Sequence, residues 1–448
     1  MMALQLSRAA EVLDGELQGP DVRFEGVSTD SRSVEPGNLF VALVGERFDG
    51  HEYLAQAAGR GAAAAAVCRE VPAELPLVRV ADTRRALGRL AAFWRRRFEI
   101  PLVAVTGSNG KTTVKEMTAA ILGAGREVLA TRGNLNNDIG VPLTLFRLDE
   151  RHRAAVIEMG ANHPGEIAWL TTIAAPTVAV ITNAGPAHLE GFGSLEGVAE
   201  AKGEIYSGLR PGGTAVVNAD DAFADLWRSL AAPRDVLTFG LDRPADLSAD
   251  WRPAGGGSRL SLRTPWGYAE LELPLPGRHN VINALAASAA ALAAGASLDE
   301  VVQGLGGMRA VSGRLQFLAG IAGARIIDDT YNANPASLGA ALEVLAATPG
   351  EHWLVLGDMG ELGPGAAELH AEAGRQAAAS GVSRLFTLGE LAGEAARAFD
   401  GHARAYQDRE ALLGDLREAM HGDLVILVKG SRRMRMEQVV EALTGGGD

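Results

Sequence analysis

A glycine-rich segment with a lysine and two threonines follows a short apolar run. Residues 104–113 read AVTGSNGKTT, and residues 101–105 are apolar. Backbone N–H groups in such a turn point at an anion, and the N-terminus of the following helix adds partial positive charge. A lysine here reaches the β- and γ-phosphates of a nucleotide, and the first threonine can ligate Mg²⁺. The segment predicts a phosphate site formed by Gly107, Ser108, Asn109, Gly110, Lys111, Thr112 and Thr113.

The spacing of this loop is shorter than that of the usual phosphate loop. The full pattern would place its first glycine at position 105, where this chain has Val105, so the shorter pattern Gly-x-x-Gly-Lys-Thr remains. A tight turn with a surface lysine is the simple alternative for so short a pattern. The place of the segment between a predicted strand and a predicted helix favours nucleotide binding.

Polar residues follow two further apolar segments. Glu158 lies near the end of the predicted strand 154–159, and His188 follows the predicted strand 176–182. In α/β sheets, ligands bind beyond the carboxyl ends of the strands, which is also where the glycine-rich loop lies. Each residue alone has a structural explanation, as a solvated carboxylate or a loop histidine, and Lys202 on the next predicted helix is by default a surface lysine. Together with the loop, Glu158 and His188 predict a metal–phosphate site.

Two later regions hold comparable polar clusters. GRHNVINALAA brings Asn280 and Asn283 to a predicted helix start, where a helix cap and recognition of an adenine edge both stay open. The segment DDTYNANPAS at 328–337 ends a predicted strand with a dense polar loop, which is typical of a ligand site. LVKGSRRMRME adds a local basic patch around Lys429 and Arg432 in an otherwise acidic chain.

Composition limits the class of protein. The 448 residues carry a formal net charge of −13 with a pI near 5.3, which argues against a general nucleic-acid binder because such proteins present a basic face. Cys68 is the only cysteine, which excludes an intrachain disulfide and fits a reducing compartment. No stretch approaches about 18 consecutive strongly apolar residues, and the first residues lack a signal-peptide pattern. We expect a soluble, cytoplasmic protein with no stable membrane insertion.

The pattern of strands and helices divides the chain into three blocks. Residues 1–82 show short β signals, residues 83–312 alternate strands and helices, and residues 313–448 restart that alternation. Continuous apolar runs predict parallel strands covered on both faces at 101–106, 154–159, 176–182 and 214–217. Strands at 324–329, 352–358, 384–389 and 424–430, each followed by a helical segment, predict a second α/β unit. A hairpin is expected around Trp266 and a helix from Val281. The sequence thus predicts an α/β protein with a glycine-punctuated hinge near 310–315.

With these segments assembled, the chain resembles the Mur ligases, the ATP-dependent amide-bond-forming enzymes of bacterial cell-wall synthesis. The resemblance follows the family's order of motifs through AVTGSNGKTT, VIEMGAN, ITNAGPAHLEGFGS, EAKGEIYSGL, GRHNVINALAA, SGRLQ and DDTYNANP. Within the family, RGNLNNDIGVPLTLF, DDTYNANPAS and LVKGSRRMRME are most similar to the branch that adds D-alanyl-D-alanine to UDP-N-acetylmuramoyl-tripeptide.

The resemblance implies an architecture for the three blocks. Residues 1–82 would form a small α/β domain that binds the UDP-muramoyl substrate. Residues 83–312 would form a central P-loop ATPase domain with a mainly parallel sheet. Residues 313–448 would form a Rossmann-like domain that binds the incoming dipeptide.

The resemblance also implies roles for single residues. ATP would meet the glycine-rich loop from Gly107 to Thr113, together with Asn280, Asn283, Arg314 and Asp329. Mg²⁺ would be ligated by Thr112, Glu158, His188 and Lys202. The catalytic residues would be Lys111, His188 and Lys202. The two substrates would be bound by Ser28, Asp30, Ser31, Arg32, Arg47, Asn134, Asn332, Asn334 and Lys429.

The implied chemistry is amide formation through an acyl phosphate, with ATP and Mg²⁺ as cofactors. Several members of the family carry a carbamate on the lysine that matches Lys202, which implies that CO₂ addition there helps to hold a second Mg²⁺. The alternatives are another amide ligase of the family, a P-loop kinase or GTPase, and a non-catalytic nucleotide-binding scaffold. We expect a monomer. The general base and the third peptide residue, diaminopimelate or lysine, are left open.

Overall fold

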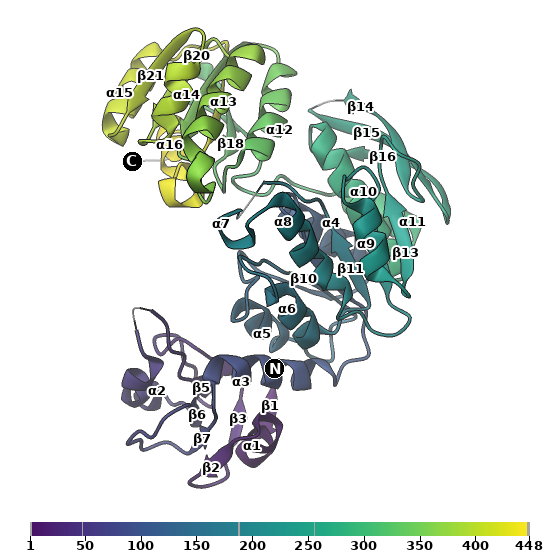
Figure 1. Ribbon diagram of the computed structural model, residues 1–448, viewed down its shortest axis with the longest axis vertical. Coiled ribbons are helices and arrows are strands. Elements are labelled where there is room, and N and C mark those ends of the chain that lie inside the picture. Colours follow the sequence, from purple (N-terminus) through teal and green to yellow (C-terminus); the bar gives the residue numbers. More distant parts are fainter. Residues whose placement is uncertain (1, 47, 187–188, 255, 446–448) are drawn as a thin grey trace.

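In the computed structural model, residues 2–46, 48–186, 189–254 and 256–445 are described, and they form units along one long axis (Figure 1). The amino-terminal and carboxyl-terminal units lie at opposite ends, and the central unit, which contains the glycine-rich loop, lies between them. The fold is α/β, as predicted. The division at residues 82/83 and 312/313 stays a prediction. No described helix is long and apolar enough to cross a bilayer.

The amino-terminal unit has two small sheets. One pairs β1 with β3, and the other has the order β2-β7-β6-β5-β4, in which only β2 runs antiparallel to its neighbour. Its strands are β1 Ala3–Gln5, β2 Glu16–Gln18, β3 Arg23–Glu25, β4 Val27–Ser28, β5 Leu39–Val41, β6 Ala64–Val67 and β7 Leu77–Arg79. Its helices are α1 Leu6–Leu13, α2 Leu54–Gly59 and the 3-10 turn η1 Gly50–Tyr53.

The central unit is built on a fully parallel six-stranded sheet in the order β13-β12-β11-β8-β10-β9. Neighbouring residues of β8 point to opposite faces, because Leu102 belongs to one apolar cluster and Val103 to another. A strand buried on both faces has to be apolar at every position, which is why its sequence shows no alternation. The strands are β8 Leu102–Thr106, β9 Val128–Ala130, β10 Ala154–Glu158, β11 Val178–Ile181, β12 Thr214–Asn218 and β13 Asp235–Phe239.

Helices and a small antiparallel sheet cover the central sheet. The hairpin predicted at Trp266 joins two strands of a three-stranded sheet, β14 Ser248–Ala254, β15 Gly257–Thr264 and β16 Gly267–Leu273. The helix predicted from Val281 begins slightly earlier, at Arg278. The helices are α4 Lys111–Gly123, α5 Gly140–Leu145, α6 Glu166–Ala174, α7 Leu189–Phe192, α8 Leu195–Gly203, η2 Glu204–Tyr206, α9 Ala224–Ala231, α10 Arg278–Ala293 and α11 Leu298–Gly306.

The carboxyl-terminal unit holds a second six-stranded sheet in the order β17-β18-β22-β19-β20-β21, with only β17 antiparallel. Its strands are β17 Gln316–Ala319, β18 Arg325–Asp329, β19 Glu351–Gly357, β20 Arg384–Leu388, β21 His402–Tyr406 and β22 Leu424–Lys429. Its helices are η3 Ile321–Gly323, α12 Pro335–Ala346, η4 Gly363–Gly365, α13 Ala366–Ala379, α14 Ala392–Ala398, α15 Arg409–Ala419, η5 Arg432–Met434 and α16 Glu437–Leu443.

The strands that the sequence patterns missed lie at sheet edges. All predicted parallel strands of both six-stranded sheets are present, whereas β9, β13, β17 and β21 were not predicted. These four are the outer strands of the two sheets. Edge strands are less covered than central ones, and β21 has no buried residue at all. A continuous apolar run is therefore not required there, and the pattern is weak.

Helix α3, Thr83–Arg95, joins the amino-terminal and central units. Its buried Leu87 and Leu90 belong to one apolar cluster that also contains Leu6 of the amino-terminal unit and Ile157 of the central sheet. Gly88 lets α6 approach α3 closely, since a Cβ atom at this position would lie 2.6 Å from the Trp169 ring and 2.9 Å from Ile173. The predicted boundary at residue 82 therefore lies beside a helix that both units share.

We expect Gly88→Ala to destabilise the protein. The new methyl group has to displace Trp169, and overpacking of this kind, partly offset by the better helix propensity of alanine, costs roughly 1–2 kcal/mol. The control is Gly414→Ala in α15, where no atom lies within 4 Å of the added Cβ. Urea unfolding should show that the control is neutral or slightly stabilising. Equal stability changes in both variants would contradict this account of α3–α6 packing.

Candidate active site

The predicted phosphate loop lies between β8 and α4, and two glycines shape it. Gly107 has φ +148°, and a Cβ atom there would lie 1.8 Å from Oγ1 of Thr182. Gly110 caps α4 with φ +80°, and its Cβ would lie 2.4 Å from Oδ1 of Asn283. Any side chain at either position would clash. The first N–H groups of α4 have no acceptor within the helix, so they can bind an anion.

The segment after β11 holds the other side of the loop. The amide of Ser108 donates to the carbonyl of Asn183 (3.0 Å), and the amide of Asn109 donates to the Asn183 side chain (3.0 Å). The Thr182 hydroxyl donates to the carbonyl of Asn109 (2.6 Å). The loop is thus fixed by its own sheet before any ligand binds, which reduces the entropy lost on binding.

Lys111 is the first residue of α4, and its side chain folds back over the loop. Its Nζ donates to the carbonyls of Gly107 (2.7 Å) and Ser108 (3.3 Å). Desolvation lowers the pKa of Lys111, the Glu158 carboxylate opposes that shift, and the Arg314 charge adds to it. A phosphate group entering the loop would supply the anion that this ammonium lacks.

Glu158 ends β10 beside the loop and is only 2% exposed. Its carboxylate accepts hydrogen bonds from the Thr112 hydroxyl (2.9 Å) and from the Asn136 amide (2.9 Å). Mg²⁺ prefers oxygen ligands and is commonly held by one or two carboxylates together with substrate phosphates. A buried carboxylate beside a threonine hydroxyl fits that ion. No group of three or more His, Cys, Asp or Glu among the described residues could hold a metal alone.

The carboxyl-terminal unit contacts the phosphate loop at two points. Nη2 of Arg314 donates to Oγ1 of Thr112 (2.8 Å), and Nδ2 of Asn334 donates to Oδ1 of Asn109 (2.8 Å). The Arg314 guanidinium also lies 4.3 Å from the centroid of the Tyr331 ring. Asn334 caps α12 through its other side-chain atom, since the Ser337 amide donates to it (2.9 Å). Asn334 therefore both caps α12 and contacts the loop.

A buried ion pair lies at the carboxyl ends of β18 and β22. The Lys429 ammonium pairs with the Asp329 carboxylate and also donates to the carbonyl of Asn332 (3.0 Å). Nearby, burial lowers the pKa of His279 to about 4, with Asp329 opposing and Lys429 adding to the shift. Nδ1 of His279 is buried without a hydrogen-bond partner. His279 is therefore neutral at pH 7.

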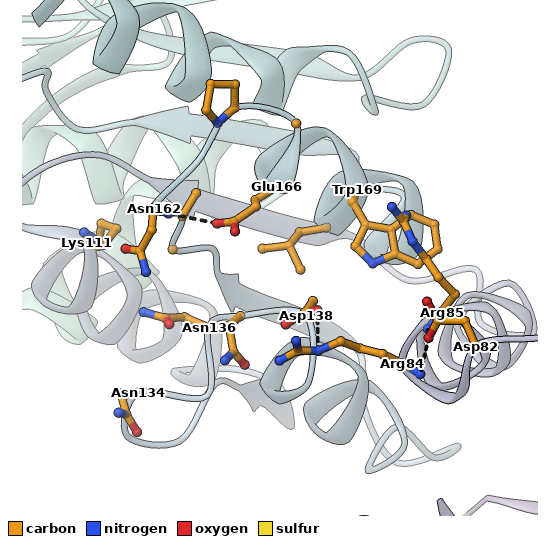
Figure 2. A pocket seen from close by; sticks show the side chains of 16 residues that line it. Asp82, Arg84, Arg85, Lys111, Asn134, Asn136, Asp138, Asn162, Glu166 and Trp169 are labelled. Atoms are coloured by element: carbon orange, nitrogen blue, oxygen red, sulfur yellow. Dashed lines mark hydrogen bonds and ion pairs between the residues drawn. The ribbon is translucent and has the colours of Figure 1, made fainter. Parts of the chain in front are cut away.

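These groups surround one cavity of about 640 Å³ between the central and carboxyl-terminal units. The structure brings together around it most of the residues singled out from the sequence, namely Ser108, Asn109, Gly110, Lys111, Thr112, Thr113, Asn134, Glu158, Asn280, Asn283, Arg314, Asp329, Asn332, Asn334 and Lys429. Gly107 forms the adjoining backbone. A second cavity, of about 730 Å³, shares Lys111, Asn134 and Asn136 with the first and extends toward α3 (Figure 2).

Lys202 lies near the end of α8 and is 2% exposed, so it is not a surface lysine. Its Nζ lies 5.5 Å from the centroid of the Phe192 ring. Burial lowers the pKa of Lys202 to about 7, and the charge of Lys111 lowers it too, whereas Glu204 opposes the shift. Lys202 lines neither of the two cavities.

The residues predicted in the amino-terminal unit lie apart from both cavities. The Ser31 hydroxyl donates to the Gln56 side chain (2.6 Å), and Ser28 bonds to the Asp30 backbone. Arg32 forms an ion pair with Asp30 (2.8 Å), and its hydrogen bonds lower the pKa of Asp30 to about 2. Arg47 and His188 lie outside the described residues, so their predicted roles stay predictions.

Family models match three parts of the chain: "Mur ligase family, catalytic domain" at 23–95, "Mur ligase middle domain" at 105–291, and "Mur ligase, glutamate ligase domain" at 313–432. A UDP-N-acetylmuramoyl-tripeptide--D-alanyl-D-alanine ligase of Escherichia coli (strain K12) is 46% identical over 451 residues, covering 100% of both chains. The chain belongs to the Mur ligase family. The alternatives of a P-loop kinase or GTPase and of a non-catalytic nucleotide-binding scaffold are therefore wrong.

Solved Mur ligase structures share the fold. The UDP-N-acetylmuramoylalanyl-D-glutamyl-2,6-diaminopimelate--D-alanyl-D-alanyl ligase of Acinetobacter baumannii is 38% identical, with a TM-score of 0.91 over 99% of both chains. MurF ligase from Thermotoga maritima, solved in complex with ADP, is 31% identical, with a TM-score of 0.85 over 94% of this chain and 97% of that one. The chain is an ATP-dependent amide ligase of this family, as the sequence motifs predicted.

Several cavity residues were not predicted from sequence. Asn136 contacts Glu158 directly, yet only Asn134 was selected from the motif RGNLNND. The Arg314 guanidinium stacks on the Tyr331 ring, and His279 lines the cavity beside Asn280. From the sequence, His279 shares with Asn280 and Asn283 the open choice between a helix cap and adenine recognition, and Tyr331 is only one member of a polar cluster. Nothing in residue type or spacing distinguishes the asparagine that faces the carboxylate from its neighbours.

Proposed function

We propose that this chain joins D-alanyl-D-alanine to UDP-N-acetylmuramoyl-tripeptide, with conversion of ATP to ADP and phosphate, giving the pentapeptide precursor of peptidoglycan. The observation that carries the proposal is the 46% identity over the full length to a ligase of that name. The phosphate loop, the strand-end carboxylate and the cross-unit contacts at one cavity support it. The Acinetobacter relative further supports diaminopimelate as the third residue of the peptide.

The chemistry follows from the poor electrophilicity of a carboxylate. The terminal carboxylate oxygen of the tripeptide attacks the γ-phosphorus of ATP, the bond to the bridging oxygen breaks, and ADP leaves. The dipeptide amine then attacks the carbonyl of the acyl phosphate, loses a proton, and expels phosphate as the amide forms. Positioning and charge stabilisation supply most of the catalysis in phosphoryl transfer.

This chain's residues fit that sequence. Lys111 and the α4 amides would bind the phosphates, and Asn280 and Asn283, which line the same cavity, would contact the adenine. Thr112, Glu158 and His188 would hold Mg²⁺, which when bound offsets the negative charge of the two anionic groups that must meet. Contacts of Arg314 and Asn334 with the loop bring the third unit over the cavity, where exclusion of water protects an acyl phosphate. No described residue is assigned as the base.

The remaining assignments complete the proposal. Ser28, Asp30, Ser31, Arg32 and Arg47 would bind the UDP end in a domain of residues 1–82. The cavity around Asn332 and Lys429 would receive the dipeptide from a domain of residues 313–448, and residues 83–312 would form the ATPase domain between them. Lys202 would act as a carbamate that helps to hold metal, and Asn134 would contact the acyl substrate.

The proposal predicts strict coupling of ATP cleavage to both substrates. Phosphate release should require UDP-N-acetylmuramoyl-tripeptide and D-alanyl-D-alanine together, and mass spectrometry should find the pentapeptide product. Lysine-containing and diaminopimelate-containing tripeptides are compared in parallel to identify the third residue. Phosphate release without the dipeptide, or a product with another amino acid at equal rate, would contradict the assignment.

Lys111→Ala should reduce turnover by orders of magnitude while leaving the fold intact, because the side chain places charge rather than packing the core. Its only described hydrogen bonds go to carbonyls of its own loop. Thermal unfolding and steady-state phosphate release are measured on the same preparation. Near-normal ligation by a folded Lys111→Ala protein would refute the role of the loop.

Lys202→Ala should also lose activity if a carbamate at this position takes part in catalysis. Short carboxylates such as acetate should partly restore the rate, since they can fill the vacated position. Lys202→Met serves as the packing control, because it fills most of the same volume and leaves less room for acetate. Full activity of Lys202→Ala, or equal acetate effects on both variants and wild type, would rule out the carbamate.

A further inference from the structure

The second cavity extends from the phosphate loop to the start of α3 and is lined by the central unit together with the first residues of that shared helix. Figure 2 shows Lys111 near one end and Arg85, stacked on Trp169, at the other. Its described lining runs from Asp82 to Leu170, so the carboxyl-terminal unit contributes none of it. Lys111, Asn134 and Asn136 also line the nucleotide cavity. A molecule in the second cavity can therefore place one end at the phosphate loop from the side opposite the third unit.

Apart from Lys111 at the phosphate loop, one cation in the described lining of this cavity has no carboxylate partner. Asp138 forms an ion pair with Nε of Arg84 (2.9 Å). Glu166 accepts from the backbone amide of Asn162 (2.8 Å), and Asp82 accepts from the first amides of α3. Arg85 has no carboxylate partner among the residues that the structure describes.

Arg85 is exposed, and stacking on the Trp169 ring orients its guanidinium. Its carbon lies 4.4 Å from the centroid of the Trp169 ring, and that ring is itself wedged against Gly88 of α3. A cation stacked on an aromatic ring keeps its N–H edge free, and the planar fork of arginine matches the two oxygens of a carboxylate. Less conformational entropy is lost when a group held in this way forms two parallel hydrogen bonds.

The acyl substrate brings carboxylates that do not react. In an alanyl-D-glutamyl-diaminopimelate peptide, the glutamyl residue and diaminopimelate each have two carboxyl groups. One glutamyl carboxyl is used in the peptide bond and one diaminopimelate carboxyl is activated, so one of each stays free. The activated carboxyl has to lie at the phosphate loop. The part of the substrate closest to it is then the peptide, not the UDP end.

We propose that the second cavity holds the peptide of the acyl substrate and that Arg85 binds one of its non-reacting carboxylates. This inference rests on the proposed function, since it takes the tripeptide as the acyl donor. Arg85 acts in recognition and positioning of the reacting carboxyl and not in phosphoryl transfer. Loss of the guanidinium should therefore affect the tripeptide and leave the other two substrates alone.

The test is Arg85→Gln, measured with three peptides: the tripeptide, its glutamyl carboxamide, and its carboxamide at the distal diaminopimelate carboxyl. For the unmodified tripeptide, kcat/KM should fall about 10- to 100-fold, as expected for loss of a charge-assisted hydrogen-bond pair. KM for ATP and for D-alanyl-D-alanine should not change. With one of the two carboxamides, kcat/KM of wild type should fall by a similar factor relative to the unmodified tripeptide. With that same peptide, Arg85→Gln should have the same kcat/KM as wild type, and this result identifies the carboxylate that Arg85 binds.

Arg89→Gln is the matched control, because Arg89 is exposed on the same helix and does not line the cavity. Calorimetric titration of the tripeptide nucleotide into each variant gives a readout independent of turnover. The proposal would be overturned if Arg85→Gln lost the same factor in kcat/KM with all three peptides, or if Arg89→Gln lost as much as Arg85→Gln. It would also be overturned if Arg85→Gln bound peptide-free UDP-N-acetylmuramate more weakly by the same factor. Failure of the proposed function is seen separately, as absence of ligation by wild type with unimpaired ATP binding.

Discussion

The phosphate loop packs so closely against neighbouring side chains that two of its positions have no room for a Cβ atom. Gly107 lies against Thr182, and Gly110 lies against Asn283. The loop, the segment after β11 and helix α10 therefore fit together only when both positions are glycine. The conformation of the loop thus rests on packing of three segments that are distant in sequence. Because the sheet itself holds these segments, the amides that face a phosphate are ordered by the fold and not by the ligand.

Closure of the site adds contacts on top of this preformed loop. Arg314 reaches Thr112 and Asn334 reaches Asn109, so the carboxyl-terminal unit contacts the same short segment that we propose binds phosphate. Those polar contacts are few, and both residues also contact their own unit, since Arg314 lies over the Tyr331 ring and Asn334 caps α12. Substrate exchange and water exclusion can then use the same interface, since a lid that closes over reactive chemistry has to open for product release.

The sequence patterns predicted the parts of the fold where burial is complete. Central strands such as β8 and β22 are buried at every position and apolar up to their last residue because both faces are covered. Edge strands such as β21 carry no such requirement and were missed. The motifs located the phosphate loop and Glu158 correctly at one sheet edge. Contacts such as that between Arg314 and Thr112 join residues about 200 positions apart, and no local pattern encodes them. The same holds for choosing Asn136 over Asn134 as the partner of Glu158.

The few lysines of this chain are almost all buried. The lysines of the sequence are Lys111, Lys115, Lys202 and Lys429, and its other basic side chains are arginines and histidines. Three of these lysines are at most 2% exposed, and Lys111 is partly covered within its loop. Amine-directed reagents therefore find few side-chain targets on the folded molecule, since guanidinium groups do not react with them. Acylation of a lysine would report transient opening of the nucleotide cavity or the core, and its rate would measure those motions without any turnover.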